Sequence, residues 1–273
     1  MEHKETDSMN NRFSIQAAFG IVILSILSAF IAGGLVLAIG LSNPDSSQKF
    51  YTFISFIIGQ GFMIVPLLWF LKSKREPIFK RLRINSISYE TLIHSIMLST
   101  GVIILSDELD RIIQSFFPAP EYIVDLNALL RPETFLGFIL LFIAVAIIAP
   151  IGEELLFRGF FQQVLEKHWK DVTRAILMTA LIFSMIHMNP YWFAQIYILG
   201  IILGFIAWKT KSVLPALILH GMNNAMAMLF AFVDLEKNNL YIWNGHVAPW
   251  IILFAIYTSY YGFSGINRMN TKS

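Results

Sequence analysis

Apolar residues along this chain gather in eight long runs that are separated by short polar segments. A helix needs about 20 mostly apolar residues to cross the ~30 Å hydrocarbon layer of a membrane, and most of the runs approach that length. The pattern therefore predicts an all-α, polytopic membrane protein with eight transmembrane helices. The predicted spans are Ile15–Leu41, Phe50–Leu71, Thr91–Leu105, Phe135–Pro150 with a helical continuation to about Glu166, Ala175–Met188, Trp192–Trp208, Val213–Val233 and Ala248–Phe263.

The third predicted span is short and is followed directly by the acidic residues Asp107, Glu108 and Asp110. The segment Asp107–Glu133 therefore reads as a connection outside the membrane, with an interfacial helix and no chemistry of its own. No internal repeat interrupts the pattern, so residues 1–273 are predicted to form a single transmembrane domain.

Composition supports this fold class. Of the 273 residues 56% are hydrophobic and 14% charged, and the mean hydropathy is +0.63, whereas a soluble domain needs far more surface charge. The net charge of +2 implies no nucleic-acid partner, and the lack of cysteine excludes disulfides, thiolate catalysis and cysteine metal ligation. The first apolar run is too long for a signal peptide, so we expect a retained helix.

The basic residues predict the orientation of the chain. With eight spans that start on the inside, 15 Lys and Arg residues fall on the inner side and only Lys49, Arg111, Arg131 and Lys237 on the outer side. Cytoplasmic loops carry an excess of Lys and Arg, so both termini are expected to be cytoplasmic. The expected location is the cell membrane, as a multi-pass protein in contact with lipids.

Three ionisable residues stand directly after the apolar run Phe135–Ile151: Glu153, Glu154 and Arg158. A charge at membrane depth costs about 2.5–3.5 kcal/mol on insertion scales and usually marks a functional site. Glu154 and Arg158 are spaced i, i+4 and can pair on one face of a helix, whereas Glu153 points about 100° away. Glu153 is thus the unpaired carboxylate, suited to general base or acid catalysis, although an interfacial charge cluster that caps the helix remains an alternative.

Two later spans carry polar side chains of their own. The fifth holds Phe183 and His187, and the seventh holds His220 and Asn224, which are spaced i, i+4. Such residues often serve only in packing or as interhelical hydrogen bonds. His94 is interpreted as a packing residue, and His3, His168 and His246 lie outside the spans, where nothing suggests a function.

Depth along the helices favours a common site. At about 1.5 Å per residue, Glu153 and Glu154 lie ~18–20 Å from the inner end of their helix. Measured from the inner ends of their own helices, His187 lies at about 20 Å and the His220–Asn224 pair at roughly 13–20 Å. Three helices then place these groups at one level, and we expect them to meet in a cavity that opens to the cytoplasmic side.

This set of groups suits the activation of water. Glu153, assisted by His187, would take a proton from a water molecule that attacks a peptide carbonyl. His220 and Asn224 would donate hydrogen bonds to the oxyanion, while Glu154 and Arg158 would support the helix. Alternatively Glu153, His187 and His220 could bind a divalent metal such as zinc, although the chain has no H-E-x-x-H motif. Nucleophilic catalysis by Ser184 is the weaker option.

At these residues the chain resembles the CPBP family of intramembrane proteases, the group of type II CAAX prenyl proteases and bacteriocin-processing proteins. The family pattern E-E-x-x-x-R, F-x-x-x-H and H-x-x-x-N is matched by Glu153, Glu154 and Arg158, by Phe183 and His187, and by His220 and Asn224. The motif region covers about Phe135–Val233. The resemblance implies peptide-bond hydrolysis in the membrane, with the first Glu and the fifth-helix His activating water and the last His and Asn binding the oxyanion. The family has been described both as metalloproteases and as glutamate-type proteases, so no cofactor is required in the second case.

The leading interpretation is an intramembrane endopeptidase, whose partners are hydrophobic or lipidated peptide substrates, CAAX-prenylated ones included. A non-catalytic immunity or regulatory protein that binds a peptide in the same cavity is the alternative. A proton- or cation-coupled transporter is a third class, but it would show inverted repeats, which the sequence lacks.

Overall fold

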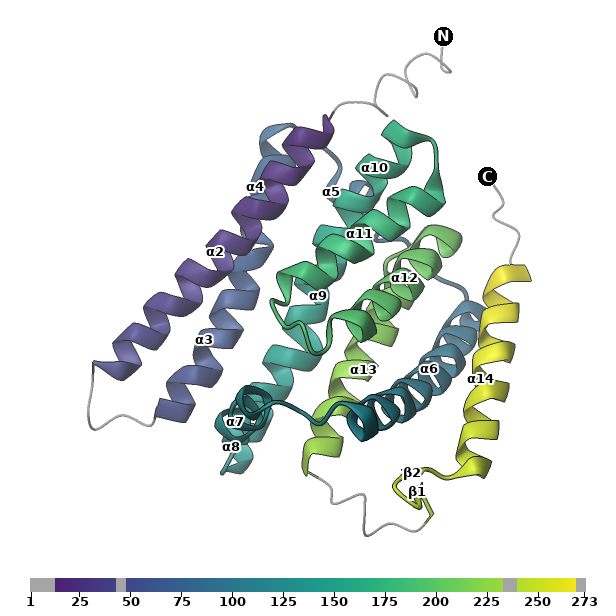
Figure 1. Cartoon of the computed structure of the whole chain (residues 1–273). Helices are drawn as coiled ribbons and strands as arrows, with labels where there is room; N and C mark the ends of the chain where they lie inside the picture. Colours follow the sequence, from purple (N-terminus) through teal and green to yellow (C-terminus); the bar gives the residue numbers. More distant parts are fainter. Residues whose placement is uncertain (1–12, 43–47, 233–239, 269–273) are drawn as a thin grey trace.

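The computed structural model describes residues 13–42, 48–232 and 240–268, and their fold is helical apart from one short hairpin (Figure 1). The all-α class is therefore confirmed. The hairpin pairs β1 (Ile242–Trp243) with β2 (His246–Val247) in antiparallel register. The helices are α2 (Ile15–Leu41), α3 (Gln48–Met63), α4 (Val65–Ser73), α5 (Ile78–Arg81), α6 (Tyr89–Phe116), α7 (Glu121–Leu130), α8 (Phe135–Phe142), η1 (Ile143–Ile148), α9 (Ala149–Leu156), η2 (Phe157–Phe161), α10 (Gln162–Trp169), α11 (Val172–Ile186), α12 (Phe193–Thr210), α13 (Leu214–Phe232) and α14 (Pro249–Arg268).

Five helical stretches of the described chain are long and apolar enough to cross a membrane. Two further apolar helices, α11 and the part of α13 up to Phe230, are shorter than these five stretches. The helix α14 has 20 residues but is not among the five. A multi-pass membrane protein is thus supported, while the count of eight spans stays a prediction. The five are Ile15–Leu41, Gln48–Ser73, Tyr89–Phe116, Phe135–Trp169 and Phe193–Thr210.

The predicted end of the third span at Leu105 is wrong, because α6 continues as one helix to Phe116. The acidic residues stay helical since each has a partner. Asp107 accepts hydrogen bonds from Arg111 one turn later and from the hydroxyl of Tyr241, and Glu108 accepts one from the backbone N–H of Val247. Tyr241 and Val247 are more than 130 residues away from these acids in the sequence. The local charge pattern therefore cannot reveal these contacts, and it predicts the wrong helix end.

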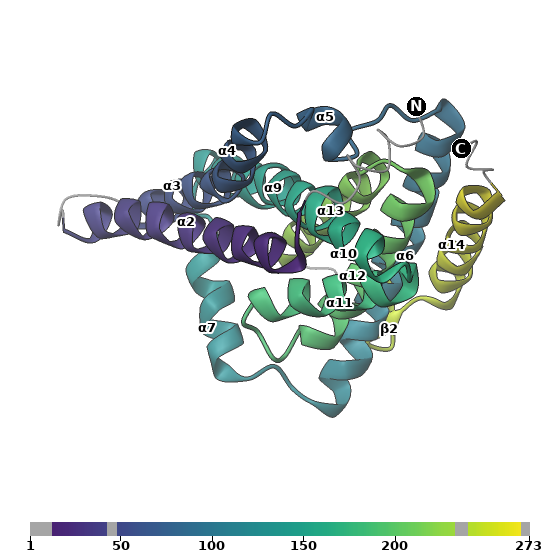
Figure 2. The same ribbon diagram turned by 90° about the horizontal axis from the view of Figure 1, so that it is seen from above.

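The long helices form a layered bundle in which α9 and α10 occupy the centre (Figures 1 and 2). On one side α2 and α3 pack together as an antiparallel pair, and on the other α6 packs against α14. Small residues permit the second contact, since a Cβ atom at Gly262 would come within 2.6 Å of the backbone of α6. The start of α2 and the end of α14 lie at the same end of the molecule (Figure 1).

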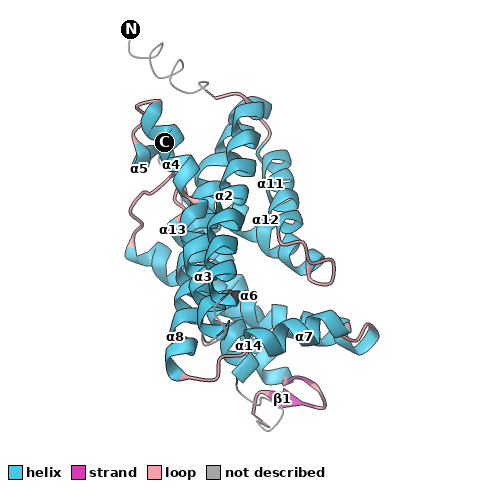
Figure 3. Ribbon diagram, turned by 90° about the vertical axis from the view of Figure 1, so that its left-hand side faces the viewer, coloured by secondary structure: helices cyan, strands magenta, loops and turns pink. Residues whose placement is uncertain are grey.

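Aromatic and aliphatic side chains fix the central helix. Phe157, Phe160 and Phe161 are fully buried or nearly so and pack in one cluster with residues of α2, α4 and α11. In contrast, large apolar side chains of α2 such as Leu24, Phe30 and Ile31 are exposed, as is typical of a surface that contacts lipid. At the end opposite to the start of α2, α7 lies across the long helices beside α8 (Figure 3).

Candidate active site

The segment Phe135–Trp169 runs through the centre of the molecule as one continuous helical path with two π-helical parts, η1 and η2. Between them lies α9, which carries Glu153 and Glu154. Pro150 has no N–H and therefore leaves the carbonyl of Ala146 in η1 without its regular helical donor. π-helical turns occur frequently at functional sites. Both carboxylates are buried, with Glu153 6% exposed and Glu154 fully enclosed.

Glu154 and Arg158 form the ion pair that their spacing predicts. Arg158 donates from its Nη1 to Oε1 of Glu154 over 2.7 Å, and neither side chain is accessible to solvent. The other end of the guanidinium donates from Nη2 to the backbone carbonyl of Gly200 on α12 over 3.2 Å. Glycine favours this close approach, since a Cβ atom at Gly200 would lie 3.1 Å from that of Ala180, which is tighter than ordinary van der Waals contact. The pair thus holds the central helix to α12.

His220 on α13 lies between the two carboxylates. Its Nδ1 is 2.9 Å from Oε1 of Glu154, and its Nε2 is 3.7 Å from Oε2 of Glu153. An ionised carboxylate only accepts, so Nδ1 carries the proton and donates to Glu154, which fixes the orientation of the ring. Nε2 then faces Glu153 at a distance too long for a direct hydrogen bond.

His187 is the C-cap residue of α11. The predicted span Ala175–Met188 placed it within the helix, which is wrong. Its side chain is exposed, and its Nδ1 lies 2.7 Å from the carbonyl oxygen of Phe183. A carbonyl only accepts, so Nδ1 donates and Nε2 of the neutral ring keeps a free lone pair. The Phe183 ring is edge-on to both imidazoles, with centroids 4.8 Å from His187 and 5.7 Å from His220, and the guanidinium of Arg158 stacks 4.2 Å from its centre.

Asn224 lies one turn after His220 on α13. Its amide Nδ2 donates to the backbone carbonyl of Val145 in η1 over 3.0 Å, so the π-helical segment holds the side chain in place. The neighbouring Asn223 donates to Oδ1 of Asn224 at a long 3.5 Å. Asn224 lines the same cavity as His220.

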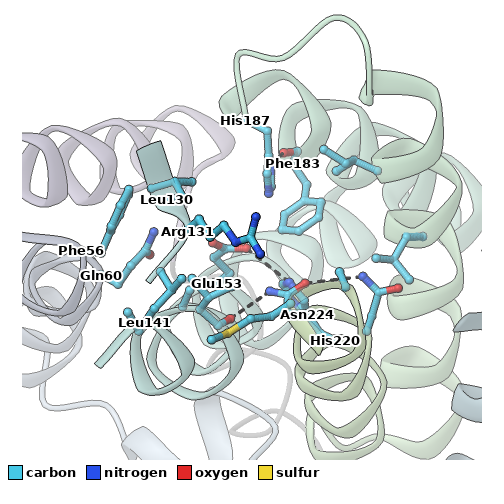
Figure 4. A pocket seen from close by; sticks show the side chains of 18 residues that line it. Phe56, Gln60, Leu130, Arg131, Leu141, Glu153, Phe183, His187, His220 and Asn224 are labelled. Carbon is cyan, nitrogen blue, oxygen red and sulfur yellow. Dashed lines mark hydrogen bonds and ion pairs between the residues drawn. The ribbon is translucent and has the colours of Figure 1, made fainter. Parts of the chain in front are cut away.

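A cavity of about 730 Å³ joins these groups (Figure 4). Glu153, Phe183, His187, His220 and Asn224 all line it, so the predicted convergence of three helices is found. The rest of the wall is mostly apolar and extends past α8 and α13 to the residues that connect α7 with α8. The remaining lining residues are Phe56, Gln60, Leu130, Arg131, Leu141, Ala144, Val145, Ala149, Ile196, Leu199, Asn223, Ala227 and Met228.

The geometry gives no support to the metal alternative. Within the described residues, no group of three His, Cys, Asp or Glu side chains is placed so that it could hold a metal ion. His187, His220 and Glu153 share the cavity, and Nδ1 of each imidazole is bonded to another acceptor, which leaves Nε2 as the ring nitrogen that could bind a ligand.

Some lining residues escaped the sequence interpretation. Gln60 is an amide in the middle of the second span, and its position among apolar neighbours was the available signal. Arg131 lies four residues before the start of the central helix. Ser184, the weaker nucleophile candidate, is buried, donates to the carbonyl of Leu181 and does not line the cavity. His94 packs against Tyr261, and His246 pairs with Glu108 outside the site.

Comparison with known proteins confirms the family resemblance over the motif region. Residues 135–226 match the family of type II CAAX prenyl endopeptidase Rce1-like proteins, and all three motifs lie within this range. The chain is also 30% identical over 120 residues to the UPF0177 protein YbdI of Lactococcus lactis subsp. lactis (strain IL1403). That alignment covers 43% of this chain and 64% of the relative, which is less than two thirds of its length. No solved structure matches the chain.

Proposed function

We propose that the protein is an intramembrane endopeptidase that hydrolyses peptide bonds in hydrophobic or membrane-anchored substrates, CAAX-prenylated proteins included. The observation that carries the proposal is the placement of the Glu153 carboxylate 3.7 Å from Nε2 of His220 in the wall of a largely apolar cavity. The family match over residues 135–226 supports peptidase activity and does not favour a non-catalytic binding protein.

In the proposed reaction, Glu153 takes a proton from a water molecule, and the water oxygen attacks the carbonyl carbon of the substrate. Oε2 of Glu153 suits this role, because it is buried and makes no hydrogen bond within the described chain. The tetrahedral intermediate then collapses, the bond from carbon to nitrogen breaks, and the leaving amine takes the proton from Glu153. His187 assists through its free Nε2, which the bond from Nδ1 to Phe183 leaves available.

His220 and Asn224 stabilise the oxyanion in this proposal. Glu154 holds the Nδ1–H of His220 and so directs Nε2 of the ring toward the cavity, where a proton on Nε2 would be donated to the oxyanion. Asn224 contributes the amide N–H that is not bonded to Val145. A donor of this kind is worth about 2.7–4 kcal/mol in the transition state where it has been measured. Glu154 and Arg158 act as positioning residues.

The test uses the purified full-length protein in liposomes with a fluorogenic hydrophobic peptide. Glu153→Gln should lower kcat/KM by about 100-fold or more, since removal of a general base typically costs 10²–10⁴-fold. Glu121→Gln, an exposed acid on α7 outside the cavity, is the matched control and should retain full activity. Unchanged cleavage by a well-folded Glu153→Gln variant would end the proposal.

A second measurement addresses the cofactor. The proposed mechanism uses only protein side chains and water, so cleavage should persist after treatment with a strong chelator, and the active protein should contain no stoichiometric metal. Loss of activity on chelation, with recovery on addition of Zn²⁺, would contradict this part of the proposal and support the metal alternative.

A further inference from the structure

Arg131 lies in the turn between α7 and α8, and its side chain reaches into the cavity that holds Glu153 (Figure 4). The backbone of this turn is anchored to α3. Lys49 donates from Nζ to the carbonyl oxygen of Arg131 over 3.1 Å and pairs with Glu133 over 2.6 Å. The acidic residue nearest to Arg131 in the sequence is therefore bound to another cation.

The guanidinium of Arg131 has no protein partner in the part of the chain that the structure describes: no carboxylate lies within ion-pair distance, and no acceptor is within hydrogen-bond distance. Arg131 is also the single Lys or Arg among the residues that line the cavity. The adjoining wall is apolar, with Phe56, Leu130 and Leu141. Arg131 is exposed at the edge of this wall and presents five N–H donors in a planar fork that matches a carboxylate.

The amide of Gln60 is a second unused polar group in the same cavity. Its Oε1 is buried and has no hydrogen-bond partner among the described residues. Buried polar atoms are nearly always paired in native proteins, so an unpaired amide oxygen that lines a cavity suits a bond from a ligand. A backbone N–H of an extended peptide would supply it.

We propose that Arg131 binds a carboxylate of the substrate and thereby sets which peptide bond reaches Glu153. This inference rests on the proposed peptidase function and adds a specificity-determining residue to it. The cavity would then bind a peptide with its anionic group at Arg131, its apolar side chains against the intervening wall and its scissile carbonyl at Glu153. The carboxylate can come from the C-terminus of the peptide or from an Asp or Glu side chain.

Matched peptides distinguish these sources. One hydrophobic sequence is prepared with a free C-terminal acid, with a C-terminal amide, and as the amide with one internal Asp. The full-length protein in liposomes should cleave a carboxylate-bearing peptide about tenfold better than the plain amide, as expected for one charge-assisted bidentate contact. Preference for the free acid identifies the C-terminus as the source, and preference for the Asp peptide identifies a side chain. Extension of the preferred acid by one residue should shift the cut by one residue.

Arg131→Gln should remove this preference, so that the free-acid, Asp and amide peptides are cleaved at the same rate, while Arg131→Lys should retain part of it. Arg174→Gln removes an exposed arginine outside the cavity and should behave as wild type. Equal cleavage of acid, Asp and amide peptides by the wild-type protein would overturn the proposal, and so would an undiminished preference in a folded Arg131→Gln variant.

Binding measurements separate this proposal from the proposed catalysis. Glu153→Gln protein, with and without Arg131→Gln, is titrated with the fluorescent forms of the same three peptides. Tighter binding of a carboxylate peptide that depends on Arg131 supports the subsite even if no peptide is cleaved. Equal binding of all three peptides contradicts it, whatever the catalytic outcome.

Discussion

Glu153 and Glu154 are neighbours in sequence but have different surroundings. Oε2 of each glutamate is buried without a hydrogen-bond partner in the described chain, but Oε1 of Glu154 accepts hydrogen bonds from both Arg158 and His220. The pairing of Glu154 with Arg158 could be predicted, because helical spacing fixes it. The bond from His220 to Glu154 could not, since it depends on how α13 packs against α9.

This difference predicts opposite effects on stability. Glu154→Gln leaves the fully buried guanidinium of Arg158 without its counter-charge, and removal of one partner of a buried pair costs about 3–5 kcal/mol. Glu153→Gln removes a charge that lacks a hydrogen bond, so the melting temperature should stay the same or rise. Thermal unfolding in one detergent compares the two variants directly.

The double variant Glu154→Gln/Arg158→Met is the control for this prediction. Removal of the orphaned cation should recover part of the stability lost in Glu154→Gln. An equal loss of stability in Glu153→Gln and Glu154→Gln would show that the ion pair does not distinguish the two glutamates.

Phe183 links the charged and catalytic parts of the site. The ring stacks on Arg158 and meets both imidazoles edge-on, whereas the sequence motif alone gave it no defined task. Phe183→Leu keeps apolar volume but removes the aromatic face, worth about 0.5–2 kcal/mol in contact with a cation. Because both imidazoles lose their support, kcat should fall about tenfold or more while the protein remains folded.

Phe160→Leu provides the matched comparison, because Phe160 is equally buried but packs against Phe13 and Phe70 away from the cavity. This variant should lose stability and keep its activity per folded molecule. Peptide cleavage normalised to the folded fraction tests the pair; the same activity in both variants would contradict a positioning role for Phe183.

At the scale of elements, the central helix departs from the regular geometry that its sequence predicts. Apolar periodicity identified a helix from Phe135 to about Glu166, but π-helical turns depend on bonds such as that from Asn224 to Val145, which join distant segments. The end of α11 at His187 is a similar case. The place of His187 at a helix terminus gives its ring access to the cavity. Asn189 and Pro190, which follow the run Ala175–Met188, indicate a nearby helix end but do not fix its last residue.

The hairpin after α13 packs against α6, and the hydrogen bond from Tyr241 to Asp107 is a part of this contact that can be tested. Its hydroxyl donates to Asp107 over 3.0 Å, and burial together with the negative charge of Asp107 raises the pKa of the phenol above its ordinary value of 10. The folded state thus holds the proton more tightly than the unfolded state, so this contribution is complete below about pH 10 and is lost as the pH rises further.

Tyr241→Phe should therefore lower the stability by about 1 kcal/mol near neutral pH, as expected for one hydrogen bond. The difference in unfolding free energy between wild type and variant should shrink as the pH rises above about 10. Denaturant unfolding at pH 8 and pH 11 measures it. A difference that is equal at both pH values would show that the phenol proton does not contribute.

For the whole molecule, hydropathy predicted the helical class and the approximate place of each long helix, since the ~30 Å apolar layer imposes length and composition. It could not establish how many helices cross the membrane, because α11 and the apolar part of α13 are short and α14 is not among the five stretches that are long and apolar enough. The cavity also runs from Glu153 to Arg131, toward the end of the molecule opposite to the start of α2. The side from which a substrate enters thus depends on the orientation in the membrane.

Orientation can be measured with introduced cysteines, because the chain has none of its own. Lys170 is exposed in the turn between α10 and α11, and Asn244 is exposed in the turn of the hairpin; the two turns lie at opposite ends of the molecule (Figure 1). The excess of Lys and Arg on the predicted inner side predicts that Lys170 lies in the cytoplasm. In intact cells a membrane-impermeant maleimide should label Asn244→Cys and spare Lys170→Cys, and both should react after permeabilisation. The reverse pattern would invert the orientation, whereas labelling of both in intact cells would contradict a membrane that lies between the two turns.

The predicted pattern would also place Arg131 on the outer side of Glu153, so a substrate carboxylate would be bound on the far side of the site from the cytoplasm.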